Sequence, residues 1–478
     1  MSEGTITTGT ETIAELRALS EIIKNSIDRI ERATAAKGLS LPSPQTPFTP
    51  ESEAARSLPE VAEAGALIVS AATQLSTLVR PGPMTMFEMA MQFHVCTALR
   101  VAIEVHVPEI LRDAGPKGLH VREIARQFNV DSRKLARILR LLATNHVFEE
   151  VDIDVFAQNR LSSILDSGKT IQSLLKNPDT KWLGSPGLCS IVAHITDEGM
   201  KISSYLPETL LDPEYGHSVS PNKAAFHKAY NTKSDLFQWL EEPGNESRLA
   251  RFGTAMEGSK SMSPPNAILG GFDWAGLKNG SKVVDCGGGV GTQAMALFRS
   301  YPHLRFVIQD RPPVIEHAVQ YWNDLIPDAV TAGKVELQGH DFFGPQPVKD
   351  ASVFLLRVVI HDWPDDFAVK ILRRLREAAT SETKLVIVEQ IVSYACEEVG
   401  VGAHSGALRA PAPLLPNLGQ AASAVYYTDM QMMICLNAQE RTESHFRELM
   451  ERGGWKVVAV HYGAPFALNA HKIVSVPL

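Results

Sequence analysis

Hydrophobic residues recur with a helical period over the first part of this chain, up to about residue 112. Residues 1–38 predict a polar helix, and the proline-rich stretch "LSLPSPQTPFTPESE" then interrupts the pattern as a linker does. Residues 58–112 again favour helices, with apolar faces in "AGALIVSAATQLSTLV" and in "MFEMAMQFHVCTALRVAIEVHV". The sequence therefore predicts amphipathic helices on both sides of one linker.

A compact unit at residues 119–161 has the pattern of a winged helix. Two helical segments, "HVREIARQFNV" and "DSRKLARILRLLATNHV", meet at a short turn where Asp131 or Ser132 is a suitable cap, and "FEEVDIDVFAQN" then alternates like a hairpin. Basic residues on the second helix would suit DNA binding: Arg133, Lys134, Arg137 and Arg140. Acidic residues interleave the region and the chain is acidic overall, so we interpret the unit as a dimerisation or packing module.

From residue 281 the pattern changes to short apolar runs that alternate with helical segments. The runs predict strands at "KVVDC", "RFVIQD", "KVELQG", "ASVFLLRVVI" and "KLVIVEQ". Helices are predicted at "TQAMALFRSY", "PPVIEHAVQYW", "DFAVKILRRLREAA" and "TESHFRELMERGG", and a closing hairpin at "KVVAVHYG" and "HKIVSVPL". This alternation is typical of an α/β fold with a mostly parallel sheet and helices on both faces.

These changes of pattern predict four segments. Residues 1–94 form an N-terminal helical extension, and residues 95–165 form the winged-helix domain. Residues 166–278 are a helical connection with several prolines, and residues 279–478 form the sheet domain.

The composition of the chain mainly excludes classes of partner and of site. The 478 residues carry a formal net charge of -8, which disfavours nucleic acid or an anionic membrane as the main partner. The five cysteines form no CxxC pair, as in reduced intracellular proteins without a disulfide framework or a zinc site. The first residues lack the pattern of a signal peptide, and no apolar run approaches the length of a membrane span. We therefore expect a soluble, cytoplasmic protein.

The stretch "SKVVDCGGGVGTQAMALF" joins a predicted strand to a predicted helix through a cluster of glycines. A dinucleotide fingerprint puts its third glycine five residues after the first, but counting from Gly287 that position is Thr292. A triphosphate-binding loop fails too, because no lysine follows. What remains is Asp285 at a strand end followed by alternate glycines, which bring bare backbone close to a ligand: Gly287, Gly289 and Gly291.

Acidic residues follow the next two strands as well. Asp310 ends "RFVIQD", at the place where nucleotide-binding sheets hold ribose hydroxyls. Asp341 and Phe342 in "GHDFF" come after the third strand, in a position to hold the edge and face of an adenine ring. In this order, the three strand ends resemble the binding site of S-adenosylmethionine-dependent methyltransferases. The resemblance implies S-adenosyl-L-methionine as the cofactor.

The fourth strand leads into "HDWPDD", and here the chain closely resembles the caffeate-type O-methyltransferases that act on phenols in plants and fungi. The resemblance spans roughly residue 95 to the end and includes "AMEGS" and "NAQERT", which matches the family's Asn-x-x-Glu-Arg-Thr. It implies that His361 is a general base, and that Glu389 and Glu440 orient it. It also implies a Rossmann-like methyltransferase domain after a winged-helix dimerisation domain, and a homodimer.

The chemistry of phenols agrees with this assignment. A phenol with a pKa of about 10 is a poor nucleophile at neutral pH, and an imidazole can accept its proton as it reacts. A carboxylate on the far ring nitrogen fixes the tautomer. No metal is expected, because the histidine fills the role that clustered carboxylates have in metal-dependent catechol methyltransferases.

The same resemblance assigns further residues to the two ligands. It places Arg357 and Trp363 near the cofactor. Around the phenolic ring it places Phe252, Met256, Met433 and Asn437, the methionines because thioethers pack well on aromatic rings. The segment "ACEEVGVGAHSGALRAPAPLLPNLGQAAS" resembles fungal members and is expected to cover the substrate.

Two other functions fit parts of the sequence. Cyclases and pericyclases of this fold use the bound sulfonium as a fixed positive charge, but such proteins usually lose the acid–base set that is intact here. A cofactor-sensing DNA-binding regulator would use the winged helix, but the acidic balance of the chain disfavours it.

Overall fold

The computed structural model of the chain describes residues 9–263, 266–397, 408–468 and 470–478. The chain divides into two compact units. The first unit comprises the residues up to Gly216 together with Ala225–Met262, and the second comprises His217–Ala224 with Ser263–Leu478.

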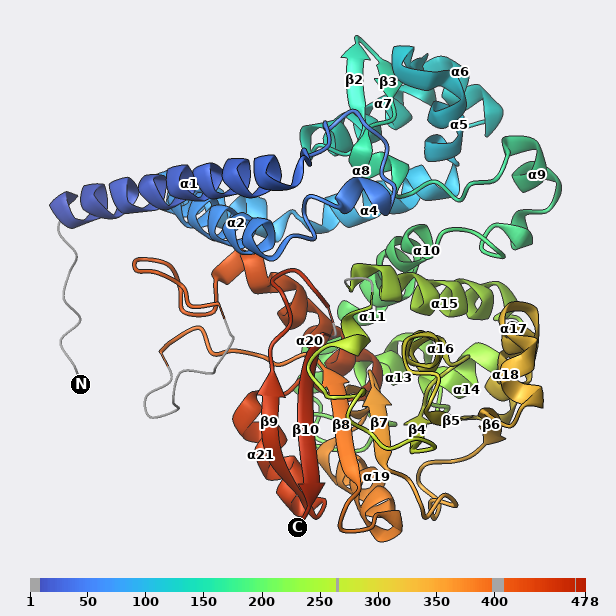
Figure 1. Cartoon of the computed structure of the whole chain (residues 1–478). Helices are drawn as coiled ribbons and strands as arrows, with labels where there is room; N and C mark the ends of the chain where they lie inside the picture. Colours follow the sequence, from blue (N-terminus) through green and yellow to red (C-terminus); the bar gives the residue numbers. More distant parts are fainter. Residues whose placement is uncertain (1–8, 264–265, 398–407, 469) are drawn as a thin grey trace. The chain divides into compact units, whose positions relative to one another are not determined.

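The first unit begins with two long helices, α1 (Gly9–Lys37) and α2 (Pro59–Val79), that pack side by side (Figure 1). Within the described residues, α2 is the one helix that is long and apolar enough to cross a membrane by length and composition, although the sequence pattern predicted no such run. Ser, Thr and Gln interrupt its apolar residues, so no continuous run is visible in the sequence. A helix in the core of a globular domain can have the same length and apolar composition. In this unit α2 packs against α1.

The winged-helix prediction is confirmed. Helices α6 (Val121–Gln127) and α7 (Ser132–Thr144) come between the first strand and the other two strands of a small antiparallel sheet. The strands are β1 (Leu119–His120), β2 (Glu149–Asp152) and β3 (Val155–Ala157), and their order in the sheet is β1-β3-β2. Asp131 is the cap of α7, since its side chain accepts a hydrogen bond from the N–H of Lys134 at 2.9 Å.

The remaining helices of this unit are short, at most 14 residues long. They are α3 (Gly82–Ala90), α4 (Phe93–Glu104), α5 (Val107–Ala114), α8 (Arg160–Ser163), α9 (Ile171–Lys176), α10 (Gly187–His194), α11 (Met200–Ser203), α12 (Leu206–Leu210), α13 (Ala225–Tyr230), α14 (Leu236–Glu241) and α15 (Glu246–Ser259).

A seven-stranded sheet organises the second unit, with the order β6-β5-β4-β7-β8-β10-β9. The first five strands in that order are parallel, and β10 is antiparallel to both of its neighbours. The strands are β4 (Lys282–Cys286), β5 (Arg305–Asp310), β6 (Val335–Gly339), β7 (Val353–Arg357), β8 (Lys384–Glu389), β9 (Trp455–His461) and β10 (His471–Pro477). The predicted α/β class, with a mostly parallel sheet and a closing hairpin, is confirmed.

Helices cover both faces of this sheet, as Figure 1 shows. The helices of this unit are α16 (Thr292–Ser300), α17 (Pro312–Leu325), α18 (Pro327–Thr331), α19 (Asp365–Ala378), α20 (Ser423–Leu436) and α21 (Glu443–Arg452). One apolar cluster joins the sheet to α19 and α21, and a second joins it to α16 and α17. Since β4, β5, β7 and β8 are buried on both faces, their carboxyl ends form a rigid edge on which a site can be built.

Candidate active site

The chain bends sharply between β7 and His361. Val358 has a left-handed backbone with a φ of 55°, and a single 3-10 turn at Ile360–Asp362 then carries His361, which is 5% exposed. β-branched residues rarely adopt positive φ, and such strain is concentrated at functional sites. The sequence pattern predicted a strand up to Ile360, but β7 ends at Arg357 because the left-handed residue breaks the ladder.

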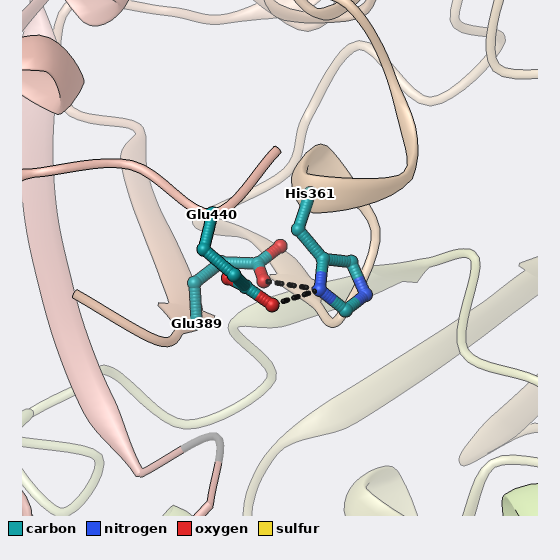
Figure 2. A group of neighbouring side chains, drawn as sticks. All are labelled: His361, Glu389 and Glu440. Atoms are coloured by element: carbon teal, nitrogen blue, oxygen red, sulfur yellow. Dashed lines mark hydrogen bonds and ion pairs between the residues drawn. The ribbon is translucent and has the colours of Figure 1, made fainter. Parts of the chain in front are cut away.

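Two glutamates contact His361 at one ring nitrogen (Figure 2). Glu440 Oε1 lies 2.7 Å from His361 Nδ1, a hydrogen-bond distance, and Glu389 Oε2 lies 3.9 Å from the same nitrogen. Glu389 is itself fixed, since its Oε1 accepts hydrogen bonds from the backbone N–H groups of Val359 and Ile360 at 3.0 and 2.8 Å. The structure therefore brings the three predicted residues together in one buried cluster.

Asp362, to which the sequence assigned no role, lies beside the other ring nitrogen. Its Oδ1 is 3.4 Å from His361 Nε2. Burial alone lowers the pKa of His361, but the charges of Glu389, Asp362 and Glu440 outweigh it and raise the pKa to about 10. Burial raises the pKa of Asp362 to about 6, and it also raises the pKa of Glu389. The imidazole in this cluster is therefore a strong proton acceptor.

The glycine loop after β4 has the backbone that its sequence predicts. Gly287, Gly289 and Gly291 have positive φ values of 72°, 61° and 84°. A Cβ at Gly287 would lie 2.8 Å from a methyl group of Val359, and a Cβ at Gly291 would lie 2.8 Å from Nε1 of Trp322. Both positions therefore exclude a side chain, and the loop packs directly against the turn that carries His361.

The acidic residues at the strand ends support this loop. Asp310 Oδ2 accepts a hydrogen bond from the N–H of Gly289 at 2.8 Å, and Oδ1 accepts one from the N–H of Arg311 at 2.8 Å. Burial raises the pKa of Asp310. Asp285 is 2% exposed, and its carboxyl carbon lies 2.7 Å from where a Cβ would stand at Gly288. Hence Asp285 and Asp310 both contact the glycine loop.

Aromatic residues line the same edge of the sheet. The ring of Phe342 reaches within 3.7 Å of the Cβ position of Gly287, and its centroid lies 5.9 Å from that of Trp363. Asp341 Oδ1 accepts a hydrogen bond from the N–H of Phe343 at 2.9 Å. Burial lowers the pKa of Lys472 to about 8, and the charge of Arg357, the last residue of β7, adds to this effect. The structure thus places Phe342 against the glycine loop and Trp363 beside Phe342, while contacts of these residues with a cofactor stay predictions.

The predicted substrate residues belong to both units. In the second unit, Asn437 caps the C-terminus of α20, and its side-chain amide donates hydrogen bonds to the carbonyls of Ser218 and Ser220 at 2.7 and 2.9 Å. Met433 precedes it on α20 and is half-buried. In the first unit, α15 carries Phe252 and Met256. Residues 398–407 of the predicted substrate cover lie outside the described residues. The substrate-binding roles all stay predictions.

The cluster also has the side chains of a metal site. One ligand atom each from His361, Glu389 and Glu440 lie within 4.8 Å of one another. However, the 2.7 Å contact between Nδ1 and Oε1 is a direct hydrogen bond, which a metal ion coordinated by both atoms would replace. The expectation that no metal takes part stays a prediction, and a chelator tests it.

Comparison with known proteins identifies the family to which the chain is similar. The family model described as O-methyltransferase domain matches residues 215–402, and the one described as O-methyltransferase dimerisation domain matches residues 87–167. An O-methyltransferase of Armillaria gallica is 40% identical over 94% of this chain and 95% of its own length. The 4-O-methyltransferase 1 of Phanerochaete chrysosporium is 40% identical over 93% of this chain and 95% of its own length.

The fold is shared more widely than the sequence. A solved structure described as a pericyclic reaction enzyme has a TM-score of 0.66 and 23% identity, covering 87% of this chain and 94% of that chain. At this identity the likeness shows the fold alone. The two matched family models and the two fungal relatives go further: this chain belongs to the S-adenosylmethionine-dependent O-methyltransferases.

Proposed function

We propose that this protein transfers the methyl group of S-adenosylmethionine to a phenolic hydroxyl, with His361 as the general base. The observation that carries the proposal is the hydrogen bond between His361 Nδ1 and Glu440 Oε1. A carboxylate at Nδ1 keeps a proton on that nitrogen and leaves the lone pair of Nε2 to accept a proton from the substrate. Glu389, at 3.9 Å from Nδ1, stabilises the imidazolium that results.

The raised pKa of His361 suits a phenol. An imidazole with its ordinary pKa of about 6.5 is a weak acceptor for a proton from a phenol with a pKa of about 10. The three carboxylates raise the pKa of His361 to about 10, so proton transfer from the phenol to the neutral imidazole is nearly balanced, and the fraction of enzyme with a neutral imidazole increases with pH. The cluster of acids therefore does more than orient the ring, since it also adjusts the basicity of the ring to its substrate.

The glycine loop and Asp310 fit the cofactor. Among the residues that the structure describes, a Cβ at Gly289 would meet no atom within 4 Å, so the backbone there is open to a ligand. Asp310 receives hydrogen bonds from two backbone N–H groups, and its carboxylate has further lone pairs for the ribose hydroxyls. Asp285, Asp341, Phe342, Arg357 and Trp363 complete the proposed cofactor site. When bound there, the cofactor supplies an electrophilic methyl group on a sulfonium.

The proposal extends to partners and location. The matched dimerisation domain supports a homodimer. We propose the cytoplasm as the compartment, and neither nucleic acid nor a membrane as a partner. One observation disfavours DNA binding. Arg140 on α7 forms ion pairs with Glu150 at 2.7 Å and with Asp154 at 2.8 Å, and both acids belong to the hairpin that follows α7. This acidic wing would repel the phosphate backbone of DNA.

The first experiment measures release of S-adenosylhomocysteine by mass spectrometry with a panel of phenols, catechols and hydroxylated polyketides. We expect release that requires an acceptor and continues in EDTA, because the base is an imidazole. Loss of activity in EDTA that magnesium restores would overturn the metal-free mechanism. Conversion of an acceptor without release of S-adenosylhomocysteine would favour the alternative, a pericyclase or cyclase.

The pH dependence provides a second test. His361 must be neutral to accept a proton, and its pKa is raised, so kcat/KM should increase with pH above pH 6.5 with an apparent pKa well above that of a free histidine. In Glu440→Gln the rise of kcat/KM with pH should move to lower pH, because one of the charges that raise the pKa of His361 is removed. The same profile should be measured with acceptors whose phenols differ in pKa. An apparent pKa that stays constant belongs to the enzyme, and one that follows the phenol belongs to the substrate. A profile that is flat between pH 6 and 9 would contradict the assignment.

A further inference from the structure

Arg441, the residue after Glu440, is a buried arginine that the mechanism above does not use. Its side chain is 0% exposed. Nη1 donates a hydrogen bond to the carbonyl of Ile360 at 2.9 Å, and Nη2 donates one to the carbonyl of Trp363 at 2.8 Å. These two carbonyls lie on either side of His361 in the chain. The guanidinium therefore holds both ends of the turn that presents the imidazole.

The backbone of Arg441 is joined to the strand that carries Glu389. Arg441 forms a parallel β-bridge with Ile391, and its carbonyl accepts a hydrogen bond from the N–H of Val392 at 2.9 Å. Glu389 ends β8 two residues before this bridge. Arg441 is thus linked to each member of the cluster: to Glu440 by a peptide bond, to Glu389 by the bridge, and to His361 by the two carbonyls.

Asp365, at the start of α19, fixes the orientation of the guanidinium. Its Oδ1 accepts hydrogen bonds from Nε of Arg441 at 3.0 Å and from Nη2 at 2.8 Å. Hydrogen bonds from His445 and Arg441 hold the pKa of Asp365 far below its usual range, so the carboxylate is charged at any pH at which the protein works. Because the guanidinium is planar and bound to this carboxylate by two of its N–H groups, its other N–H groups point in fixed directions. A lysine ammonium would not be fixed in this way.

We propose that Arg441 is a positioning residue that sets the orientation of His361 relative to Glu440 and Glu389. This inference rests on the proposed role of His361 as the base. If Arg441 sets the turn, its loss should leave ligand binding in place and slow the chemical step. A misplacement of the base by about 1 Å costs on the order of a hundredfold in rate.

The test compares Arg441→Lys with Arg452→Lys and His361→Ala in the full-length protein. Arg452 is the matched control, because it binds Asp366 at 2.8 Å and approaches the same Asp365 at 3.9 Å, with a side chain that is 39% exposed. For Arg441→Lys we expect kcat to fall by roughly ten- to a hundredfold, with the KM of the acceptor and the Kd of S-adenosylhomocysteine within about twofold. Arg452→Lys should retain its kcat.

A readout independent of activity follows the ring itself. In ¹⁵N-edited NMR spectra of histidine side chains, the His361 signals are identified by their loss in His361→Ala. In Arg441→Lys the pKa of His361 should shift toward its ordinary value, because the contact of Nδ1 with Glu440 loosens. If Arg441→Lys does not fold, Asp365→Asn weakens the orientation of the guanidinium and should give the same shift with a smaller amplitude.

The outcomes separate the two proposals. A wild-type kcat and an unchanged titration of His361 in Arg441→Lys, with His361→Ala inactive, would overturn the positioning role and leave the base in place. Turnover that survives in His361→Ala would overturn the base and, with it, the role of Arg441 in methyl transfer. A lower kcat with a shifted His361 titration supports the positioning role.

Discussion

The variant His361→Ala is expected to turn over at least two orders of magnitude more slowly than the unaltered protein, while its affinity for S-adenosylmethionine is nearly unchanged. A positioned general base contributes typically a hundred- to ten-thousandfold to rate. The glycine loop contacts the His361 turn through a side-chain methyl group of Val359, so removal of the imidazole leaves that contact intact. Release of S-adenosylhomocysteine gives the turnover, and calorimetry gives the Kd.

Chemical rescue distinguishes a missing base from a disturbed fold. Added imidazole should restore part of the turnover in His361→Ala, in proportion to the concentration of its neutral form. Wild-type turnover without imidazole would exclude His361 as the base. A large loss of cofactor affinity would show instead that His361 belongs to the cofactor site.

The second large effect is expected at Asp310. Asp310→Ala should lower the affinity for S-adenosylmethionine by about a hundredfold or more, since hydrogen bonds to a charged group contribute roughly 1.5–3 kcal/mol each. The alanine removes both the proposed bonds to the ribose and the acceptor for the N–H of Gly289. The Kd of S-adenosylhomocysteine, measured by calorimetry, reports the change without requiring turnover.

Asp350→Ala is the matched control for this prediction. Asp350 is also an aspartate of the sheet domain, but its side chain is 71% exposed and its carboxylate binds Lys282 at 2.7 Å, at the other end of β4. Its Kd should equal that of the unaltered protein. If the Kd of Asp310→Ala lies within about threefold of the control, Asp310 does not hold the cofactor.

The fold was predictable where local pattern determines structure. Doubly buried strands such as β4 and β8 are recognisable as apolar runs, and residue type limits the cap of α7 to Asp131 or Ser132, of which the structure uses Asp131. The order of the last strands was not predictable in this way. β10 lies between β8 and β9, so the last strand of the chain pairs with β8, and the penultimate strand, β9, forms the edge of the sheet. Alternation of apolar residues predicts a strand but does not specify its neighbours.

Motif spacing likewise identified the members of the site without their geometry. His361 and Glu440 are 79 residues apart in the chain, and only the fold brings Nδ1 and Oε1 to 2.7 Å. Asp362 and Arg441 were visible in the sequence as the neighbours of predicted residues, yet nothing in the pattern indicates that Asp362 contacts Nε2 or that Arg441 spans the His361 turn. Such contacts depend on backbone bends that no periodicity reports.

The left-handed Val358 has a consequence for engineering this protein. A β-branched residue at a φ of 55° costs on the order of 1–3 kcal/mol, so a search for thermostable variants would select glycine or asparagine there. Glycine would relieve the strain but widen the range of conformations open to the turn, and the imidazole would lose its fixed direction. Heat resistance and turnover are therefore opposing objectives at this position, and a stabilised variant of this protein should retain the valine.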